Sequence, residues 1–186
     1  MKNVLFLLFS VMITYSVPAQ TKAGGAIIPN TVSFEGEKLI LNGVGVREKF
    51  WMNMYAGALY LNSKSTNGNT IISSNEPMAI KLHMVSNMIT SERMIEAVNE
   101  GFNNSPGGKS AALTADIEKF KGFFKEGISK DDVFDIVYLP SRGVVVFKNN
   151  KELGNIKGMP FKRALFGIWL SNKPADKKLK SGMLGN

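Results

Sequence analysis

The chain has 186 residues and a formal net charge of +8 at neutral pH, with 44% hydrophobic and 20% charged residues. This balance is typical of a single globular domain and excludes a disordered chain, a collagen-like chain and a coiled coil. The sequence has no cysteine and one histidine, which excludes disulfides, cysteine nucleophiles, cysteine-ligated zinc and sites built from several histidines.

Residues 1–19 have the order of a secretory signal peptide. Lys2 precedes an apolar run over 4–15, and small or medium residues at 17–19 provide a cleavage site. The run is shorter than the roughly 20 residues that a membrane-spanning helix needs. The sequence therefore predicts export to the periplasm or the extracellular space, with residues 20–186 as the mature domain. The alternative is a buried N-terminal helix of the domain.

The first half of the mature chain is rich in β-forming residues and short turns. Its predicted elements are β structure over 26–34, a tight turn at 35–37, a strand over 38–42, an extended segment over 47–62, a short helix over 69–74 and a strand over 77–86. The last of these is supported by hydrophobic residues that alternate along one face. Strands with short connections are typical of an antiparallel sheet.

Two helices are predicted next. Thr90 or Ser91 is placed to cap the first, whose apolar residues recur at helical spacing up to Phe102. Residues 105–108, Ser-Pro-Gly-Gly, then break the chain. The second helix ends at Gly127, and its continuous apolar face consists of Leu113, Ile117, Phe120 and Phe124.

The last part of the chain returns to strands and ends in helices. The predicted elements are strands over 132–139 and 143–148 around a hairpin turn at 140–143, a tight turn at 149–150, a strand over 152–156, a helix over 159–170 and a short lysine-bearing helix from Pro174. Strands, a helical pair, more strands and final helices together predict an antiparallel α+β domain.

The segment 41–61 carries a motif that points to a known family. Its sequence, Leu-Asn-Gly-Val-Gly-Val-Arg-Glu-Lys-Phe and then Met-Tyr-Ala-Gly-Ala-Leu-Tyr-Leu, resembles the glycine-flanked arginine motif and following strand of the chalcone isomerase-like superfamily. The resemblance is closest to the exported bacterial branch and extends over about residues 27–184. Residues 80–84, 99–102, 153–156, 161–165 and 168–170 agree with that branch in order. It implies a large antiparallel sheet covered on one face by helices.

The superfamily contains isomerases, which close a flavonoid ring, and non-catalytic members, which bind fatty acids. Both groups share the arginine that Arg47 matches. Tyr55 stands where plant isomerases have a threonine, as in the fatty-acid-binding members, and Gly167 stands where they have a second threonine. The tyrosine, lysine and asparagine that line the isomerase cleft are matched here by Thr90, Arg93 and Ala97.

The missing polar groups favour an exported, non-catalytic protein that binds a small hydrophobic carboxylate such as a fatty acid. Two alternatives stay open: an isomerase or lyase acting on an enone or flavonoid-like compound, and a partner-binding protein without a ligand. No cofactor and no metal are expected, and the sequence leaves the oligomeric state open.

The predicted ligand-binding residues are Arg47, Tyr55, Thr90 and Arg93. Arg47 lies among apolar residues, and its planar guanidinium suits a carboxylate, to which the Tyr55 hydroxyl is also able to donate. A straight strand would separate the two by roughly 26 Å, so they share a site only if the chain turns between Glu48 and Asn53. The alternatives are an ion pair with a protein carboxylate for Arg47 and a core position for Tyr55.

Other polar residues are predicted to be structural. His83 is expected to be a satisfied strand histidine, because no Gly-x-Ser-x-Gly turn is present to offer a nucleophile. Asp131, Asp132 and Asp135 lack the spacing of a calcium loop and are expected at a solvated strand entry. Lys81, like Arg93, is a candidate for the cleft and equally for the surface.

The positive charge is concentrated near the C-terminus, where Lys173, Lys177, Lys178 and Lys180 stand against Asp176. We expect a solvated tail, with weak contact to an anionic membrane surface as the alternative. The other basic residues are scattered among acidic ones and form no basic stripe interleaved with aromatic side chains. Nucleic acid is therefore not expected as a partner.

Overall fold

The computed structural model of the chain describes residues 20–49 and 51–186. The signal peptide predicted over 1–19 lies outside the described residues. Within the described part, no helix combines the length and the apolar character that crossing a bilayer requires.

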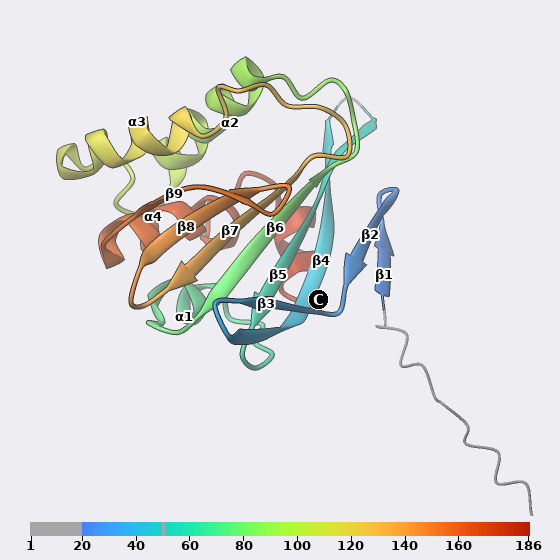
Figure 1. The fold of residues 1–186 in the computed structure, drawn as a ribbon, viewed down its shortest axis with the longest axis horizontal. Helices are drawn as coiled ribbons and strands as arrows, with labels where there is room; N and C mark the ends of the chain where they lie inside the picture. Colours follow the sequence, from blue (N-terminus) through green and yellow to red (C-terminus); the bar gives the residue numbers. More distant parts are fainter. Residues whose placement is uncertain (1–19, 50) are drawn as a thin grey trace, which may run out of the picture.

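The centre of the molecule is a seven-stranded sheet in which every strand pairs antiparallel with its neighbours in the chain. Its strands, in spatial and sequence order, are β3 (Thr31–Phe34), β4 (Glu37–Lys49), β5 (Met52–Leu61), β6 (Met78–Met84), β7 (Val133–Leu139), β8 (Gly143–Lys148) and β9 (Lys151–Ile156). A separate hairpin of β1 (Gln20–Ala23) and β2 (Ala26–Pro29) precedes it (Figure 1).

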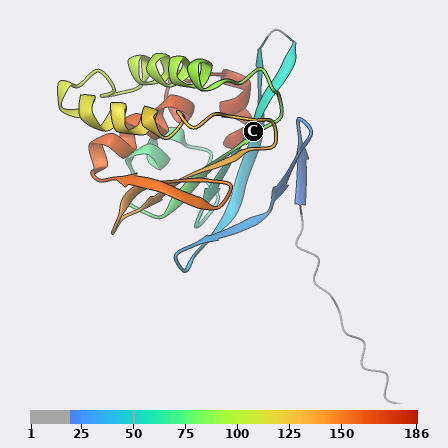
Figure 2. The ribbon, with the colours of Figure 1, turned by 45° about the horizontal axis from the view of Figure 1, so that its top comes forward.

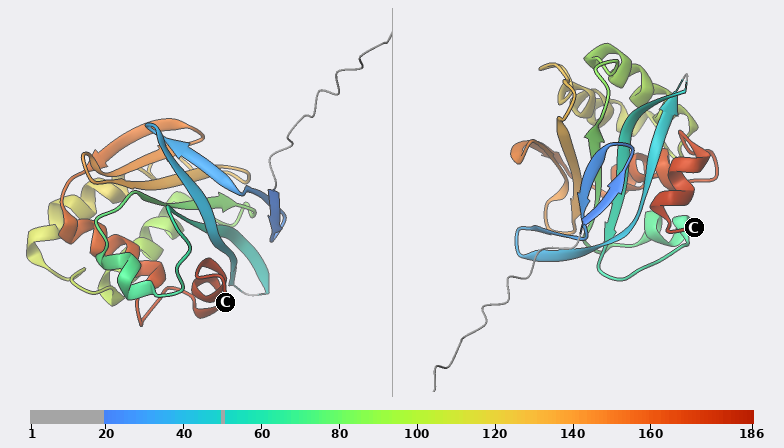
Figure 3. Two further views of the ribbon diagram at one scale, coloured as in Figure 1. Left: turned by 90° about the horizontal axis from the view of Figure 1, so that it is seen from below. Right: turned by 90° about the vertical axis from the view of Figure 1, so that its right-hand side faces the viewer.

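All helices lie on one face of this sheet (Figures 2 and 3). They are α1 (Gly68–Ser73), α2 (Ser91–Asn104), the 3₁₀ turn η1 (Ala111–Leu113), α3 (Thr114–Gly122), α4 (Met159–Leu170) and α5 (Lys177–Met183). Helix α4 is central: it packs against α1, α2 and the sheet, and most of its side chains are buried. The predicted α+β class and the one-sided helical cover are therefore confirmed.

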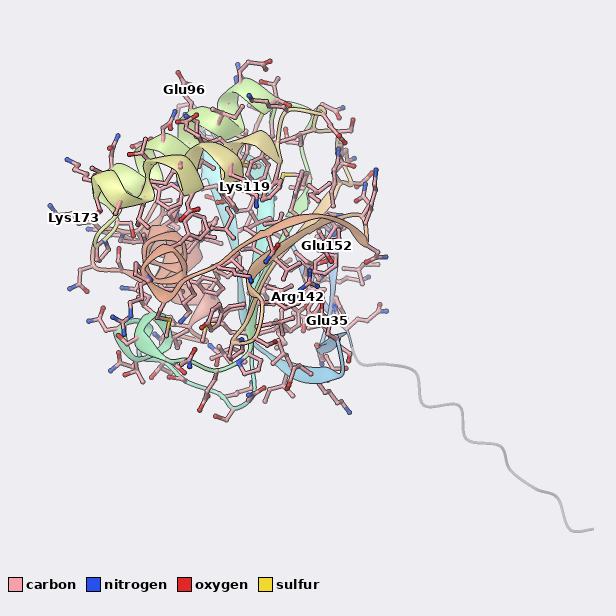
Figure 4. All side chains as sticks on the ribbon, turned by 60° about the vertical axis from the view of Figure 1, so that its left-hand side comes forward. Glu35, Glu96, Lys119, Arg142, Glu152 and Lys173 are labelled. Atoms are coloured by element: carbon pink, nitrogen blue, oxygen red, sulfur yellow. The ribbon has the colours of Figure 1, made fainter. Side chains whose placement is uncertain are left out.

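The opposite face of the sheet is closed by curling rather than by helices. Small side chains such as Ala56, Ala58 and Ala79 lie there, fully buried with the β1–β2 hairpin. The curl brings Phe34 of β3 onto Phe147 of β8, with their ring centroids 5.8 Å apart. At the rim Arg142 bonds to both Glu35 and Glu152, which lie on either side of it (Figure 4). The sheet is a half-barrel whose ends are held together by these contacts.

One buried charge ties α1 to α4. Lys162 has no exposed surface, and its Nζ donates to the carbonyls of Ile71, Ile72 and Ser74 at 2.7–2.9 Å. Carbonyls at the end of a helix have no partner within the helix, so the ammonium group satisfies them and complements the negative end of the α1 dipole. The rings of Tyr138 and Phe166 lie 5.2 and 5.4 Å from the same nitrogen. This lysine is part of the core.

Several predicted boundaries were wrong. The second predicted helix ends at Gly122 and not at Gly127, and the last helix begins at Lys177 and not at Pro174. The β structure over 26–34 is two strands in two sheets, which separate at Asn30. The strand over 38–42 continues to Lys49, because its glycines stay extended beneath a helix. The extended segment over 47–62 is interrupted at Trp51, where the chain reverses from β4 to β5.

Candidate functional site

Helix α5 packs directly on the glycines of the arginine motif in β4. A Cβ at Gly45 would lie 2.6 Å from the Leu179 carbonyl oxygen, and a Cβ at Gly43 would overlap the Gly182 carbonyl. Gly182 of the helix has the same relation to β4, since a Cβ there would lie 2.5 Å from the Val44 oxygen. Helix and strand therefore meet backbone to backbone, which only residues without side chains permit.

Arg47 and Tyr55 are directly opposite each other across the β4–β5 pair. The turn that the sequence required between Glu48 and Asn53 is present, and the two side chains lie on the helix-covered face. No glycine or proline makes this turn; Trp51 takes a left-handed conformation with φ of 61°. The hairpin, not a bend in one strand, brings the two predicted ligand-binding residues together.

Arg47 contacts the loop before α5. Its Nη1 donates to Asp176 Oδ2 at 3.0 Å and to the Ala175 carbonyl. Asp176 also caps α5, because its Oδ1 accepts from the Leu179 N–H at 2.9 Å. Seating α5 on the glycines thus places a carboxylate beside the arginine. The alternative of an ion pair for Arg47 is observed, with a partner 129 positions away in the chain.

Tyr55 is held by the indole of Trp169 on α4. Trp169 Nε1 donates to the Tyr55 oxygen at 3.2 Å, so the tyrosine proton remains able to donate to a ligand. Burial raises the pKa of Tyr55 above its usual value of 10, against the opposing effects of the Trp169 bond and the Arg47 charge. At neutral pH the hydroxyl therefore stays protonated and neutral.

Arg47 and Tyr55 both line a hollow between α2, α4 and the β4–β5 hairpin. Its deeper part has a volume of about 100 Å³ and its outer part about 400 Å³. Both parts are lined by Arg47, Tyr55, Met94, Ala97 and Glu100. The deeper part adds mainly apolar residues: Leu82, Val98, Gly101, Asn104, Ile168, Trp169, Pro174 and Ala175. The outer part adds Lys49, Met54, Met88, Ile89, Arg93 and Glu96. Its size is that of a small-molecule site.

The other two predicted ligand residues lie at the start of α2. Arg93 lines the outer part of the hollow, and its Nη1 donates to the Met88 carbonyl at 2.9 Å. Thr90 is the N-cap of the helix: its Oγ1 accepts from the Arg93 N–H at 3.3 Å. The hydroxyl of Thr90 therefore serves the helix end, and Thr90 does not occur among the described residues that line the hollow.

Gly167 on α4 faces the start of the loop after α2. A Cβ at this position would overlap Ser105 Oγ, whose hydroxyl donates to the Ala164 carbonyl. A threonine here would need Ser105 to move. The loop after α2 thus fills the space in which a hydroxyl-bearing side chain of α4 would stand.

Several polar residues of the site were not foreseen from the sequence. Trp169 and Asp176 are the polar partners of Tyr55 and Arg47, and Glu100 and Asn104 line the hollow from α2. Asp176 carried one local signal, because an aspartate directly before a helix is a common N-cap. Nothing in the local sequence connected it to Arg47.

The remaining acidic candidates pair with different basic groups. Asp135 lies 2.6 Å from Lys81 and Asp132 lies 3.0 Å from Lys148. Asp131 lies 3.8 Å from His83 Nε2. Lys81 thus forms a cross-strand ion pair and is not part of the hollow's described lining. In residues 20–49 and 51–186, no three acidic or histidine side chains converge as metal ligands.

Comparisons with known proteins address the whole fold. A family model described as chalcone isomerase-like matches residues 20–185. The structure is similar to the crystal structure of a fatty-acid binding protein from Arabidopsis thaliana, with a TM-score of 0.70 and 17% sequence identity, over 90% of this chain and 97% of that one. No curated protein sequence matches this chain.

Proposed function

The chain belongs to the chalcone isomerase-like family, and from this we propose that it is a non-catalytic binding protein for a small hydrophobic carboxylate such as a fatty acid. One observation carries the proposal. Arg47 and Tyr55, a charged donor and a neutral donor, lie side by side where the deeper, mainly apolar part of a hollow meets its outer part.

The donors suit a carboxylate headgroup. Both bonds that Arg47 makes to the described residues use Nη1, and the guanidinium has further N–H groups on Nη2 and Nε that fit a carboxylate. A charge-assisted bond of this kind contributes roughly 1.5–3 kcal/mol. Each methylene of an acyl chain that leaves water in the hollow adds about 0.8 kcal/mol, so the affinity should rise with chain length.

Two further observations support binding over isomerisation. The Thr90 hydroxyl caps α2, and Ser105 occupies the space next to Gly167 in which a threonine would stand. The similar fold of a protein named for fatty-acid binding supports the same class of ligand. An isomerase or lyase acting on an enone or flavonoid-like compound is the alternative, and turnover of a chalcone that Arg47→Ala abolishes would favour it.

The test is binding of a fluorescent fatty acid to purified protein, with native mass spectrometry of what co-purifies. Arg47→Ala should lower the affinity by roughly 10- to 100-fold, the equivalent of one charge-assisted hydrogen bond. Arg163→Ala is the matched control, because Arg163 is an exposed arginine that does not line the hollow. Equal affinity in the Arg47→Ala and Arg163→Ala proteins would overturn the proposal.

Asp176 provides a second test, in which the substitution should raise the affinity for a fatty acid instead of lowering it. Its carboxylate shares Arg47 with the ligand, so it repels an incoming anion. Asparagine is as good an N-cap as aspartate, and Asp176→Asn should therefore keep α5 in place. We expect it to raise the affinity for a fatty acid and to leave that for the matching fatty alcohol unchanged. Equal gains for both ligands would mean that the hollow had merely widened.

We also propose that the protein is exported, on the strength of the signal-like order of residues 2–19. Expression of the full chain, followed by N-terminal sequencing of the accumulated protein, tests this. A mature protein that begins at Gln20 outside the cytoplasm is expected. An intact N-terminus on cytoplasmic protein would contradict it.

A further inference from the structure

The tip of the β4–β5 hairpin exposes apolar side chains that the proposed ligand site does not use. Trp51 is 100% exposed and Met52 41%. The third exposed large hydrophobic residue of the described part, Ile27 at 53%, is on the separate β1–β2 hairpin. Two of the three are therefore neighbours at one projecting tip, which extends beyond the body of the sheet (Figure 3, right).

The backbone of this tip is strained for the residue it carries. Trp51 has φ of 61°, in the left-handed region that turns normally fill with glycine or asparagine. A bulky side chain in this region is unfavourable, and here it also loses all cover from the rest of the protein. Strain combined with full exposure points to a role outside the folded chain.

The tip leads directly into the outer part of the hollow. Lys49 and Met54, which flank the tip on its two strands, both line that part. Met88 and Arg93, from the loop before α2 and from its first turn, line it opposite the hairpin. A surface that covers the tip would therefore also lie next to the hollow through which a ligand enters.

Positive charge is concentrated beside the same hairpin. Helix α5, with the lysines that dominate the C-terminus, is seated on β4, and Lys178 lies 3.7 Å from Glu48. Lys177, Lys178 and Lys49 are exposed. The acidic groups of this region are Glu48, Glu96, Glu100 and Asp176, and they are outnumbered by the basic groups Arg47, Lys49, Arg93, Lys177, Lys178 and Lys180. Exposed tryptophan beside lysines is the combination that favours the headgroup region of an anionic bilayer.

We propose that the β4–β5 tip is a membrane-contact site, where Trp51 and Met52 enter the interface of an anionic lipid bilayer while the lysines of α5 face its headgroups. This deepens the proposed function, on which it rests for its purpose: a ligand with an acyl chain would pass between the bilayer and the hollow behind the tip. The contact itself is testable without any fatty acid.

The experiment uses the protein's own fluorescence. The chain has two tryptophans, Trp51 and Trp169. Trp169→Phe leaves Trp51 as the single reporter, and vesicles of phosphatidylcholine, with or without phosphatidylglycerol, are added. With phosphatidylglycerol we expect a blue shift of the emission and quenching by lipids brominated on their acyl chains. Unchanged emission with these vesicles would overturn the proposal.

Vesicle sedimentation in the otherwise unchanged chain gives an independent measurement. Trp51→Ala should weaken binding to phosphatidylglycerol vesicles on the order of tenfold, because a large side chain no longer leaves water. Ile27→Ala is the matched control and should bind as the unchanged protein does. Binding unaffected by Trp51→Ala would overturn the proposal, as would a blue shift that depends on protein concentration without vesicles, because a second copy would then cover the tip.

The two proposals fail separately. Trp51 does not line the hollow, so Trp51→Ala should bind fluorescent fatty acid in solution with unchanged affinity. Vesicle contact without fatty-acid binding in the unchanged protein would retain the membrane-contact site and reject the fatty-acid ligand. Fatty-acid binding without vesicle contact would retain the fatty-acid ligand and reject the membrane-contact site.

Discussion

Arg47 and Lys162 are both cations on the helix-covered side of the sheet, but their surroundings differ. Lys162 is fully buried, and its three N–H groups meet three backbone carbonyls. Arg47 keeps 26% of its side chain exposed, has a carboxylate and one carbonyl as partners through a single nitrogen, and borders a hollow. Lys162 has no donor left for a ligand, whereas Arg47 has several.

A structural charge and a binding charge therefore differ in how many hydrogen-bond donors they have left for a ligand. A buried ammonium is tolerated only when its donors are satisfied, so the surroundings of Lys162 leave it no second role. A guanidinium at the edge of a hollow is hydrated and needs no such saturation. Residue type alone does not distinguish the two, because both are basic residues in apolar sequence.

The largest effect is expected when the structural charge is removed. Lys162→Met should lower the free energy of unfolding by about 3 kcal/mol or more, because buried carbonyls at the end of α1 lose their donor. Urea denaturation measures this. Lys119→Met is the matched control: Lys119 also donates to a carbonyl, that of Asn155, but from an exposed position (Figure 4). Equal stability of the two variants would mean that Lys162 is no more a structural charge than an exposed lysine is.

The next effect concerns the seat of α5. Gly45→Ala puts a methyl group against the Leu179 carbonyl and should cost roughly 1–3 kcal/mol by overpacking. Because α5 carries Asp176, its displacement should also disturb Arg47 and change fatty-acid affinity. In Gly122→Ala, by contrast, the methyl group meets no atom within 4 Å, and the protein should be as stable as before or more so. Denaturation and ligand titration on the three proteins test this.

The free energy of unfolding should also depend on pH through Lys162. Burial, together with the charge of Arg163, lowers the pKa of Lys162 from 10.5 to about 8. Between these values the unfolded chain binds more protons than the folded one, so stability rises with pH and is lost again as pH falls toward 8. Over about pH 7.5–9.5 the gain should be roughly 2 kcal/mol and should be absent in Lys162→Met.

The buried tyrosines do not ionise within the range of pH 7.5–9.5. Burial raises the pKa values of Tyr55, Tyr60 and Tyr138 above 10. A tyrosine whose pKa is raised in the folded state stabilises the fold at pH values below its unfolded-state pKa of about 10. This stabilisation is lost as the pH rises above 10, so the tyrosines change the stability only from about pH 10 upward. A flat stability profile below that, in the unchanged protein, would contradict the assignment of the rise to Lys162.

The smallest effect on stability is expected at Arg47 itself. Arg47→Ala removes a partly exposed ion pair, and such pairs contribute about 0–1 kcal/mol. A binding charge should thus affect ligand affinity much more than folding, the reverse of Lys162. Thermal unfolding and fatty-acid titration of the same Arg47→Ala sample make the comparison, and a loss of stability as large as that of Lys162→Met would place Arg47 among the structural charges.

Much of the fold followed from local patterns. Alternation over 77–86 and the helical spacing toward Phe102 correspond to β6 and α2, and the Pro-Ser-Arg-Gly turn lies between β7 and β8. The predicted strand over 38–42 stopped too early, because nothing in the local sequence shows that Gly43 and Gly45 continue β4 under helix α5.

The candidate site was predicted in part. Arg47, Tyr55 and Arg93 line the hollow, while Thr90 caps α2. The turn at Trp51 was required by the hypothesis but had no glycine or proline to signal it. A left-handed tryptophan is held by the pairing of β4 and β5 on either side, which overrides the preference of the residue.

The sequence by itself determined the class of fold, most of the elements and the arginine at the centre of the proposed site, because periodicity and turn chemistry act over a few residues. Only the tertiary structure decided which charge is free to bind a ligand. Asp176 reaches Arg47 across 129 positions, Lys162 finds its carbonyls about 90 positions away, and the hollow takes its walls from separate strands and helices. Such contacts arise when backbones pack face to face, and local sequence does not encode them.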